Sequence, residues 1–244
     1  MIASAPIAEA RARWPRRVVA ELLDELPPDD PRALRSRRDL RLVNRIMGHS
    51  GPLARALDPV AAAPLRLVEL GAGDGTLLLQ LARRRARRWP PAAVTLLDTQ
   101  PTVTPATLAA LRAVGWSVDV VAADALEWLD QPSAARDAVV LANLFVHHFE
   151  GERLARLLAG VAAHAAAFVC CEPRRARLAL LGSHLLWALG CNDVTRHDAV
   201  VSVHAGFRER ELTAAWQSAA GAGWHVEETP AGAFSQLLSA RRAP

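Results

Sequence analysis

Residues 65–76 read Leu65-Arg66-Leu67-Val68-Glu69-Leu70-Gly71-Ala72-Gly73-Asp74-Gly75-Thr76, a largely apolar run that carries one acid and ends in three alternating glycines. Such a run bounded by glycine is typical of a buried parallel strand. The glycines let the backbone take positive φ and come close to a ligand. Residues 76–89 are then expected to form a helix whose first N–H groups are unpaired and partly positive. The pattern predicts a strand, a turn and a helix that hold a nucleoside cofactor at the carboxyl edge of a parallel sheet.

The spacing of the glycines narrows the choice of cofactor. The dinucleotide fingerprint G-x-G-x-x-G places its third glycine one residue later than Gly75. Glu69, two residues before Gly71, is unfavourable beside a phosphate but suits the ammonium group of an amino acid. The pattern resembles the first motif of class I S-adenosylmethionine-dependent methyltransferases, and the resemblance covers the chain from about residue 60 onward. It implies cofactor contacts from Glu69, Gly71, Ala72, Gly73 and Gly75.

Three further segments follow in the order that this family shows. Residues 93–98 end in Asp98, where an acid about 20 residues after the turn binds the ribose hydroxyls. Residues 117–125 end in Asp124-Ala125, and the resemblance implies that this carboxylate meets the adenine amino group. Residues 137–143 close in Asn143 and lead to two adjacent histidines. The implied cofactor contacts of these segments are Asp98, Thr99, Asp124, Ala125, Asn143 and Leu144.

The resemblance implies an α/β fold with a seven-stranded Rossmann-like sheet, in the strand order 3-2-1-4-5-7-6 with strand 7 antiparallel. We expect an N-terminal helical cap over residues 1–58 and a methyltransferase domain over residues 59–244. Within the cap, helices are expected over 8–26 and 33–48, separated by a proline-rich break. The cap is expected to cover the mouth of the cofactor and substrate site. A mere packing layer or a dimer surface is the alternative.

The second half of the chain continues the alternation of helices and strands. The pattern predicts a helix over 150–164, a strand over 166–171 and a very apolar helix over 177–190. Residues 191–198 are polar and rich in turn formers, which indicates a turn region. A helix over 208–220 and a closing antiparallel hairpin, formed by 224–228 and 233–241, complete the expected fold.

Composition argues against several classes of protein. The chain has 244 residues, of which 51% are hydrophobic, enough for one α/β core with an extension. It has no lysine, and 29 basic against 25 acidic residues give a net charge of +4. We interpret the arginine content as the imprint of a GC-rich genome, so no nucleic-acid partner is predicted. The three cysteines lack metal-ligand spacing, and no signal peptide or membrane span is recognisable. We expect a cytoplasmic protein with a small-molecule substrate, with a homodimer as one option for its assembly.

Methyl transfer to a hydroxyl group requires removal of a proton. A phenol has a pKa near 10, as tyrosine does, so deprotonation at neutral pH needs a base such as histidine at about 6.5. His147 and His148 follow the fourth strand, beside the expected position of the methyl group. His197, next to Asp198, lies in the insertion after the fifth strand. These three histidines are the candidates for the catalytic base.

The sequence lacks the marks of several methyltransferase subclasses. The N/D-P-P-Y/F motif of nucleobase amino methylation is missing after the fourth strand. Glu172-Pro173 stands where catechol-type enzymes carry an Asp-Asn pair for a metal, so an enzyme without metal is expected. Segments 43–48, 172–175 and 195–198 resemble bacterial methyltransferases found with type III polyketide synthases. That resemblance implies O-methylation of a phenolic or enolic polyketide.

Three alternatives stay open. One is C- or N-methylation of a small aromatic or quinone-precursor ring by the same fold. Another is a non-catalytic protein that binds S-adenosylmethionine and lends a surface to a synthase. A dinucleotide oxidoreductase is a distant third, disfavoured by the glycine spacing and by Glu69.

Overall fold

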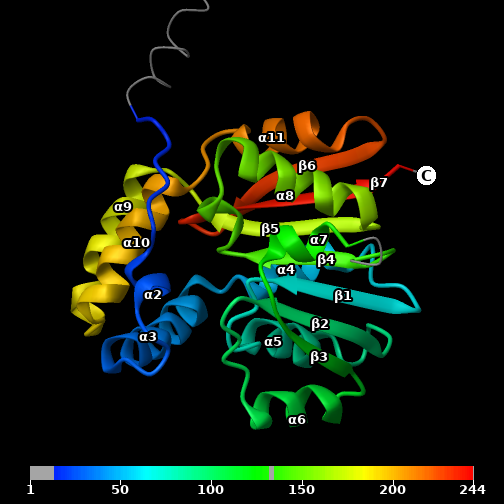
Figure 1. The fold of residues 1–244 in the computed structure, drawn as a ribbon, viewed down its shortest axis with the longest axis horizontal. Coiled ribbons are helices and arrows are strands. Elements are labelled where there is room, and N and C mark those ends of the chain that lie inside the picture. Colours follow the sequence, from blue (N-terminus) through cyan, green and yellow to red (C-terminus); the bar gives the residue numbers. More distant parts are fainter. Residues whose placement is uncertain (1–13, 132–134, 244) are drawn as a thin grey trace, which may run out of the picture.

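A computed structural model describes residues 14–131 and 135–243 and contains one seven-stranded sheet (Figure 1). The strand order is β3-β2-β1-β4-β5-β7-β6, with β7 antiparallel to both of its neighbours. The predicted fold class and strand order are therefore confirmed. The strands are β1 (Leu65–Leu70), β2 (Ala92–Asp98), β3 (Ser117–Ala122), β4 (Val139–Asn143), β5 (Ala167–Pro173), β6 (Trp224–Ala231) and β7 (Ser235–Arg242).

Helices cover both faces of this sheet and bury two apolar cores. One core contains side chains from α4 (Ser50–Leu57), α5 (Thr76–Arg85) and α6 (Pro105–Ala113). The other contains side chains from α7 (Ala125–Leu129), α8 (Gly151–His164) and α11 (Glu211–Ala220). Both faces of the central strands are thus buried, which explains why β1, β4 and β5 have nearly continuous apolar sequences.

A helical layer lies beyond one end of the sheet, at the left of Figure 1. It combines α2 (Leu22–Glu25) and α3 (Pro31–Met47) from the start of the chain with three later elements. The later elements are α9 (Arg177–His184), the 3-10 helix η2 (Leu185–Leu189) and α10 (Asp193–Ala205). We call this layer the cap. Polar contacts join its two parts, because Asp198 accepts hydrogen bonds from the backbone N–H groups of Leu22 and Leu23.

Two expectations about the cap are wrong. The helix predicted over 8–26 lies outside the described residues up to residue 13. Residues 14–21 are not helical, so α2 is the only helix among the described residues of this range. The turn region predicted over 191–198 is mostly the first part of α10. Asn192 caps this helix by accepting a hydrogen bond from the Thr195 N–H, and buried polar side chains face the N-terminal segment.

Smaller differences concern the ends of helices. The helix after the glycine turn ends at Arg85, before the predicted residue 89, and the one predicted from residue 208 begins at Glu211. The apolar segment 177–190 divides into α9 and η2. No helix in the described ranges is long and apolar enough to cross a membrane.

Candidate active site

The turn between β1 and α5 is fixed by the neighbouring strand β2. The N–H groups of Gly71 and Ala72 both donate to the carbonyl of Leu97. Asp98 accepts a hydrogen bond from the Gly73 N–H at 2.8 Å with one oxygen, and from the Gln100 N–H at 2.8 Å with the other. Each carboxylate oxygen keeps a second lone pair. The acid that was predicted to bind ribose is therefore held rigidly beside the glycine turn.

The three glycines of the turn have positive φ but face different surroundings. A Cβ on Gly71 would lie 2.4 Å from the Phe145 ring, and one on Gly75 would lie 3.0 Å from Leu96. A Cβ on Gly73 would meet no described heavy atom within 4 Å. Gly73 also lines a cavity, so that open direction is space for a ligand.

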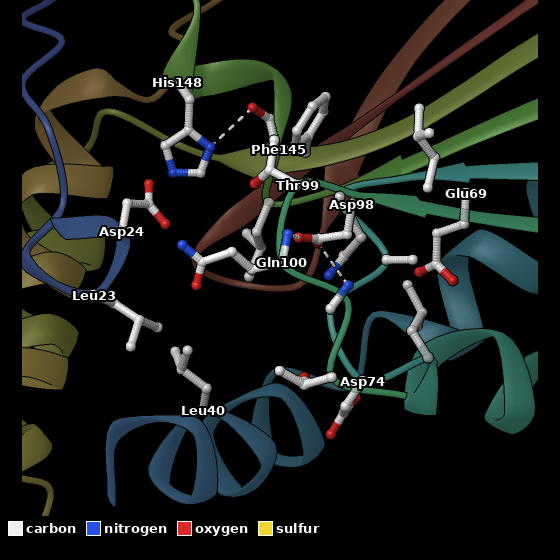
Figure 2. Close-up of a pocket in the computed structure, with 18 of the residues that line it drawn as sticks. Leu23, Asp24, Leu40, Glu69, Asp74, Asp98, Thr99, Gln100, Phe145 and His148 are labelled. Atoms are coloured by element: carbon white, nitrogen blue, oxygen red, sulfur yellow. Dashed lines mark hydrogen bonds between the residues drawn. The ribbon is translucent and has the colours of Figure 1, made fainter. Parts of the chain in front are cut away.

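That cavity, which we call the sheet-edge cavity, has a volume of about 480 Å³ and lies at the carboxyl ends of the parallel strands. The predicted residues that line it are Glu69, Gly71, Ala72, Gly73, Asp98, Thr99, Asp124, Ala125, Asn143, Leu144, His147 and His148. Figure 2 shows Asp98, Asp74 and Glu69 on one side and Asp24 and His148 on the other. Two predicted residues do not line it. Gly75 faces Leu96 and Thr107, and His197 lies on α10 with a side chain that is 49% exposed.

Glu69 is a buried carboxyl group with an unpaired oxygen. The residue is 2% exposed, and its Oε2 has no hydrogen-bond partner within the described part of the chain. Burial, together with the nearby charges of Asp74 and Asp98, raises the pKa of Glu69 to about 8. A buried acid of this kind is costly without a partner, so its place on the cavity wall suits a cationic group.

The cap supplies the opposite wall of the sheet-edge cavity. The lining residues from α3 include Leu40, Arg41 and Asn44, and those from the N-terminal segment include Glu21 and Asp24. Arg41 lies 3.4 Å from a carboxylate oxygen of Asp74 on the glycine turn. The cap and the sheet edge therefore meet across the cavity through opposite charges.

His147 is held at the base of the cavity by Glu172. The 3-10 helix η1 (Val146–His148) follows β4, and Glu172 at the end of β5 accepts hydrogen bonds from the Val146 N–H at 2.9 Å and from His147 Nδ1 at 2.8 Å. Burial lowers the pKa of His147, but hydrogen bonds and charges from Glu172 and Glu21 outweigh it and raise this pKa to about 9. Burial opposes ionisation of Glu172, yet the contacts with His147 keep its pKa below the usual value.

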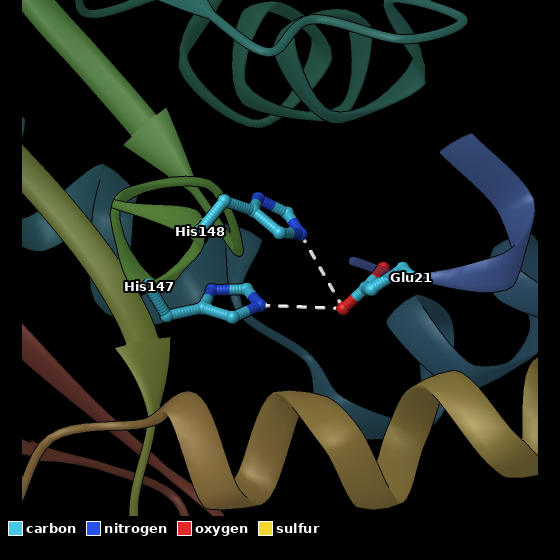
Figure 3. Close-up of side chains that lie close together, drawn as sticks. All are labelled: Glu21, His147 and His148. Carbon is cyan, nitrogen blue, oxygen red and sulfur yellow. Dashed lines mark ion pairs between the residues drawn. The ribbon is translucent and has the colours of Figure 1, made fainter. Parts of the chain in front are cut away.

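Glu21 completes a cluster that sequence reasoning missed. Its Oε1 lies 3.6 Å from His147 Nε2 and 3.3 Å from His148 Nε2 (Figure 3). The same oxygen accepts a hydrogen bond from Ser202 on α10. Burial opposes ionisation of Glu21, but the two histidines outweigh it and hold its pKa far below the usual value. Glu21 is 126 positions from His147 and stands in no motif, so no local signal marks it.

A second cavity of about 440 Å³ lies between the cap helices, and we call it the apolar cavity. Its wall is almost entirely aliphatic, with side chains such as Val43, Met47 and Leu186. It shares Glu21, Leu23, Leu40, Asn44, Leu144 and Ser202 with the sheet-edge cavity. The two cavities therefore adjoin, and Glu21 stands at their junction.

Comparisons with known proteins agree with this fold. A family model described as "Methyltransferase domain" matches residues 67–167, the segment from β1 to β5. The comparison with curated proteins gives no match.

Three solved structures are similar at low sequence identity. The plantazolicin methyltransferase BpumL in complex with SAH has 11% identity and a TM-score of 0.63, over 88% of this chain and 91% of the other. The dimethyltransferase RosA from Streptomyces davawensis, named for an amino-riboflavin, has 17% identity and a TM-score of 0.56, over 98% and 65%. The small RNA methyltransferase HEN1 has 18% identity and a TM-score of 0.50, over 74% and 23%. These likenesses show the fold alone, and the match to a methyltransferase domain is confined to residues 67–167. The chain therefore has the fold of solved methyltransferases and contains a segment that is similar to a methyltransferase domain.

Proposed function

We propose that this protein transfers a methyl group to a hydroxyl oxygen of a phenolic or enolic small molecule of the polyketide type. The cofactor would lie in the sheet-edge cavity and the acceptor in the apolar cavity. The observation that carries the proposal is Glu69, a buried carboxyl group with an unpaired oxygen on the wall of the first cavity.

The residues of the sheet-edge cavity fit S-adenosylmethionine better than a dinucleotide. Glu69 suits the ammonium of the methionine part, and the open direction at Gly73 leaves room for a backbone-to-ligand contact. Asp98 at the end of β2 suits the ribose hydroxyls, and Asp124 at the start of α7 suits the adenine amino group. The many acids on this wall would repel a pyrophosphate, and they favour a ligand with a net positive charge.

The apolar cavity supports the choice of acceptor class. Its mainly aliphatic wall would exclude water from a hydrophobic ring or alkyl chain, while Glu21 and Ser202 offer polar groups where it adjoins the sheet-edge cavity. An acceptor held in this way would present its polar end to the junction of the two cavities. Phenols and enols with apolar substituents have one polar end and one apolar part, so they match this arrangement.

The cluster of Glu21, His147 and His148 is the group we assign to activation of the hydroxyl. Bound S-adenosylmethionine supplies a methyl group on a sulfonium sulfur, and the bond from that carbon to sulfur breaks as the bond to the acceptor oxygen forms. The residues of this chain must align the acceptor and assist loss of its proton. His147 and His148 line the sheet-edge cavity beside Glu21 at the junction, whereas His197 lines neither cavity.

Calorimetry and product analysis test this proposal. Purified protein is expected to bind S-adenosylmethionine, and D98A should weaken binding by about 1–3 kcal/mol, as for a lost charge-assisted hydrogen bond. The matched control is D119A, an exposed acid on β3. With ¹³C-methyl cofactor and a panel of alkylresorcinols and related phenols, NMR should show a new O–CH₃ group.

Three other outcomes would contradict parts of the proposal. A new C–CH₃ or N–CH₃ group would replace O-methylation by the alternative acceptor atoms. Tight complex formation with a synthase, without turnover on any phenol, would replace the enzyme by a cofactor-binding partner. Equal affinity for the cofactor in D98A and D119A would contradict the placement of the ribose.

A further inference from the structure

Three potential metal ligands converge at the junction of the two cavities. They are His147 Nε2, His148 Nε2 and a carboxylate oxygen of Glu21, and all lie within 4.8 Å of one another. Figure 3 shows both imidazole rings pointing at the same Glu21 oxygen, from the turn after β4 and from the segment before α2. The histidines and the acid come from opposite walls of the sheet-edge cavity.

The protons on the two rings can be assigned from their outer neighbours. His147 Nδ1 lies 2.8 Å from a Glu172 carboxylate oxygen, and His148 Nδ1 lies 3.1 Å from the Phe145 carbonyl oxygen. Both neighbours are acceptors, so each Nδ1 must carry the hydrogen. In a neutral ring Nε2 then carries a lone pair. Neither Nε2 has a hydrogen-bond partner among the described residues.

With both rings neutral, this arrangement would set two nitrogen lone pairs against the Glu21 carboxylate. His147 is 1% exposed and the Glu21 side chain is 14% exposed, so water relieves little of the repulsion between them. Some positive charge must lie between the three atoms. It is either a proton on one or both rings, as the raised pKa of His147 favours, or a single cation bound by all three ligands.

We propose that Glu21, His147 and His148 bind a divalent transition metal of the Zn²⁺ type. Ligand atoms 2.0–2.2 Å from a tetrahedral Zn²⁺ lie about 3.3–3.6 Å apart. The observed separations from Glu21 Oε1 are 3.3 Å and 3.6 Å. Two imidazoles and one carboxylate, with a further position open, are the donor set of catalytic zinc sites.

The surroundings of the three ligands match those of metal sites. Ligating histidines almost always donate their second N–H to a carboxylate or a backbone carbonyl, and ligating carboxylates accept hydrogen bonds. Glu172 fills that role for His147, the Phe145 carbonyl for His148, and the Ser202 hydroxyl for Glu21. Each ligand therefore has an outer partner of the expected kind.

The expectation of an enzyme without metal was argued from a different position than the proposed site. The expectation of an enzyme without metal used the place after β5, where Glu172-Pro173 replaces an Asp-Asn pair. In the structure Glu172 contacts His147 instead, and two of the proposed ligands follow β4. The third comes from a segment far away in the sequence.

The proposed site would activate the acceptor, a step that rests on the proposed function. A hydroxyl oxygen at the open coordination position would have a lowered pKa, as water does on catalytic zinc. Its proton would pass to solvent water, and the resulting oxyanion would attack the methyl carbon. The sheet-edge cavity adjoins the cluster on the side where the methyl donor would lie.

Metal binding is measured on tag-free, chelator-treated protein with Co²⁺ and Zn²⁺ as probes. We expect one equivalent of Co²⁺ to give visible absorption bands of four- or five-coordinate Co²⁺, and Zn²⁺ to displace it. E172Q should weaken Zn²⁺ binding by about 10–100-fold, as outer partners do, and E21Q and H148Q should weaken it further. H197Q is the matched control, because His197 also pairs with a carboxylate, at 3.0 Å, but lies outside the cluster. Circular dichroism establishes that each variant is folded.

The same titrations can overturn the site. Failure of the wild-type chain to bind a stoichiometric metal would refute it, as would equal affinity in H148Q, E21Q and H197Q. Nitrogen NMR that shows a proton on both Nε2 atoms in the presence of excess Zn²⁺ would favour protonated rings instead. Calorimetry with S-adenosylmethionine is run in parallel, so loss of the metal site and loss of the proposed function are separate results.

Discussion

The two walls of the sheet-edge cavity are built in different ways. On the sheet edge, the glycine turn and Asp98 are neighbours through the parallel pairing of β1 and β2, and an apolar core lies beneath them. In the cap, polar side chains join segments more than 150 residues apart, as where Asp198 accepts hydrogen bonds from Leu22 and Leu23. The first wall is rigid because its packing is apolar and close. The second is held by a few directional bonds, so it can open more easily.

The largest effect is expected at Glu172, which holds the segment after β4 and His147 in place. Glu172 is fully buried and accepts hydrogen bonds from three backbone N–H groups and from His147. E172A should lower the free energy of unfolding by about 3–5 kcal/mol, because it leaves a buried cation and several donors unpaired. Urea unfolding of E172A and of the control E227A, an exposed acid on β6, measures this. A decrease in the free energy of unfolding no larger than that of E227A would contradict the role of Glu172.

The next prediction tests the sheet-edge wall alone. G73A places a methyl group in the open space of the sheet-edge cavity, so affinity for S-adenosylmethionine should fall by about 1–3 kcal/mol. G115A is the control, since Gly115 also has positive φ and open space, but in a turn away from the cavities. Both variants place a side chain at positive φ, and only G73A should lose cofactor affinity in calorimetry. Equal losses would show that strain alone acts.

A third substitution isolates the cap. D198A removes the acceptor for two N–H groups of α2, which costs about 1–3 kcal/mol, mainly in local stability. Hydrogen exchange over residues 14–47 should become faster while β1 and β2 keep their protection. D193A on the same helix breaks an exposed ion pair with Arg32 and should change little. Uniform loss of protection across the sheet would remove the distinction between the two walls.

The smallest effect concerns pH and Glu69. The pKa of its carboxyl group is about 8, so below that pH the free protein carries a proton there. A bound ammonium favours the carboxylate, so cofactor binding should release a proton. Affinity should therefore rise between pH 7 and pH 8, by up to about tenfold, and E69Q should abolish this dependence. If the cofactor affinity of the wild-type protein does not change with pH, Glu69 does not contact the ligand.

The contrast between the walls also explains what the sequence could predict. The glycine turn, Asp98 and Asp124 follow short apolar runs, and the parallel register carries all of them to one edge. Glu21 gives no such signal, because long-range contacts with His147 and Ser202 decide its position. The polar start of α10 was mistaken for a turn region for the same reason. Thr195 and Asp198 are buried against the N-terminal segment, so their polarity reflects partners elsewhere in the chain.

A crystal structure with S-adenosylhomocysteine bound is the decisive measurement. The amino acid part of the ligand should lie beside Glu69 and Gly73, with its ribose on Asp98 and its sulfur directed toward the junction at Glu21. Density for the ligand elsewhere, or with its adenine on Glu69 and its amino acid part on Asp124, would contradict the assignment of the sheet-edge cavity.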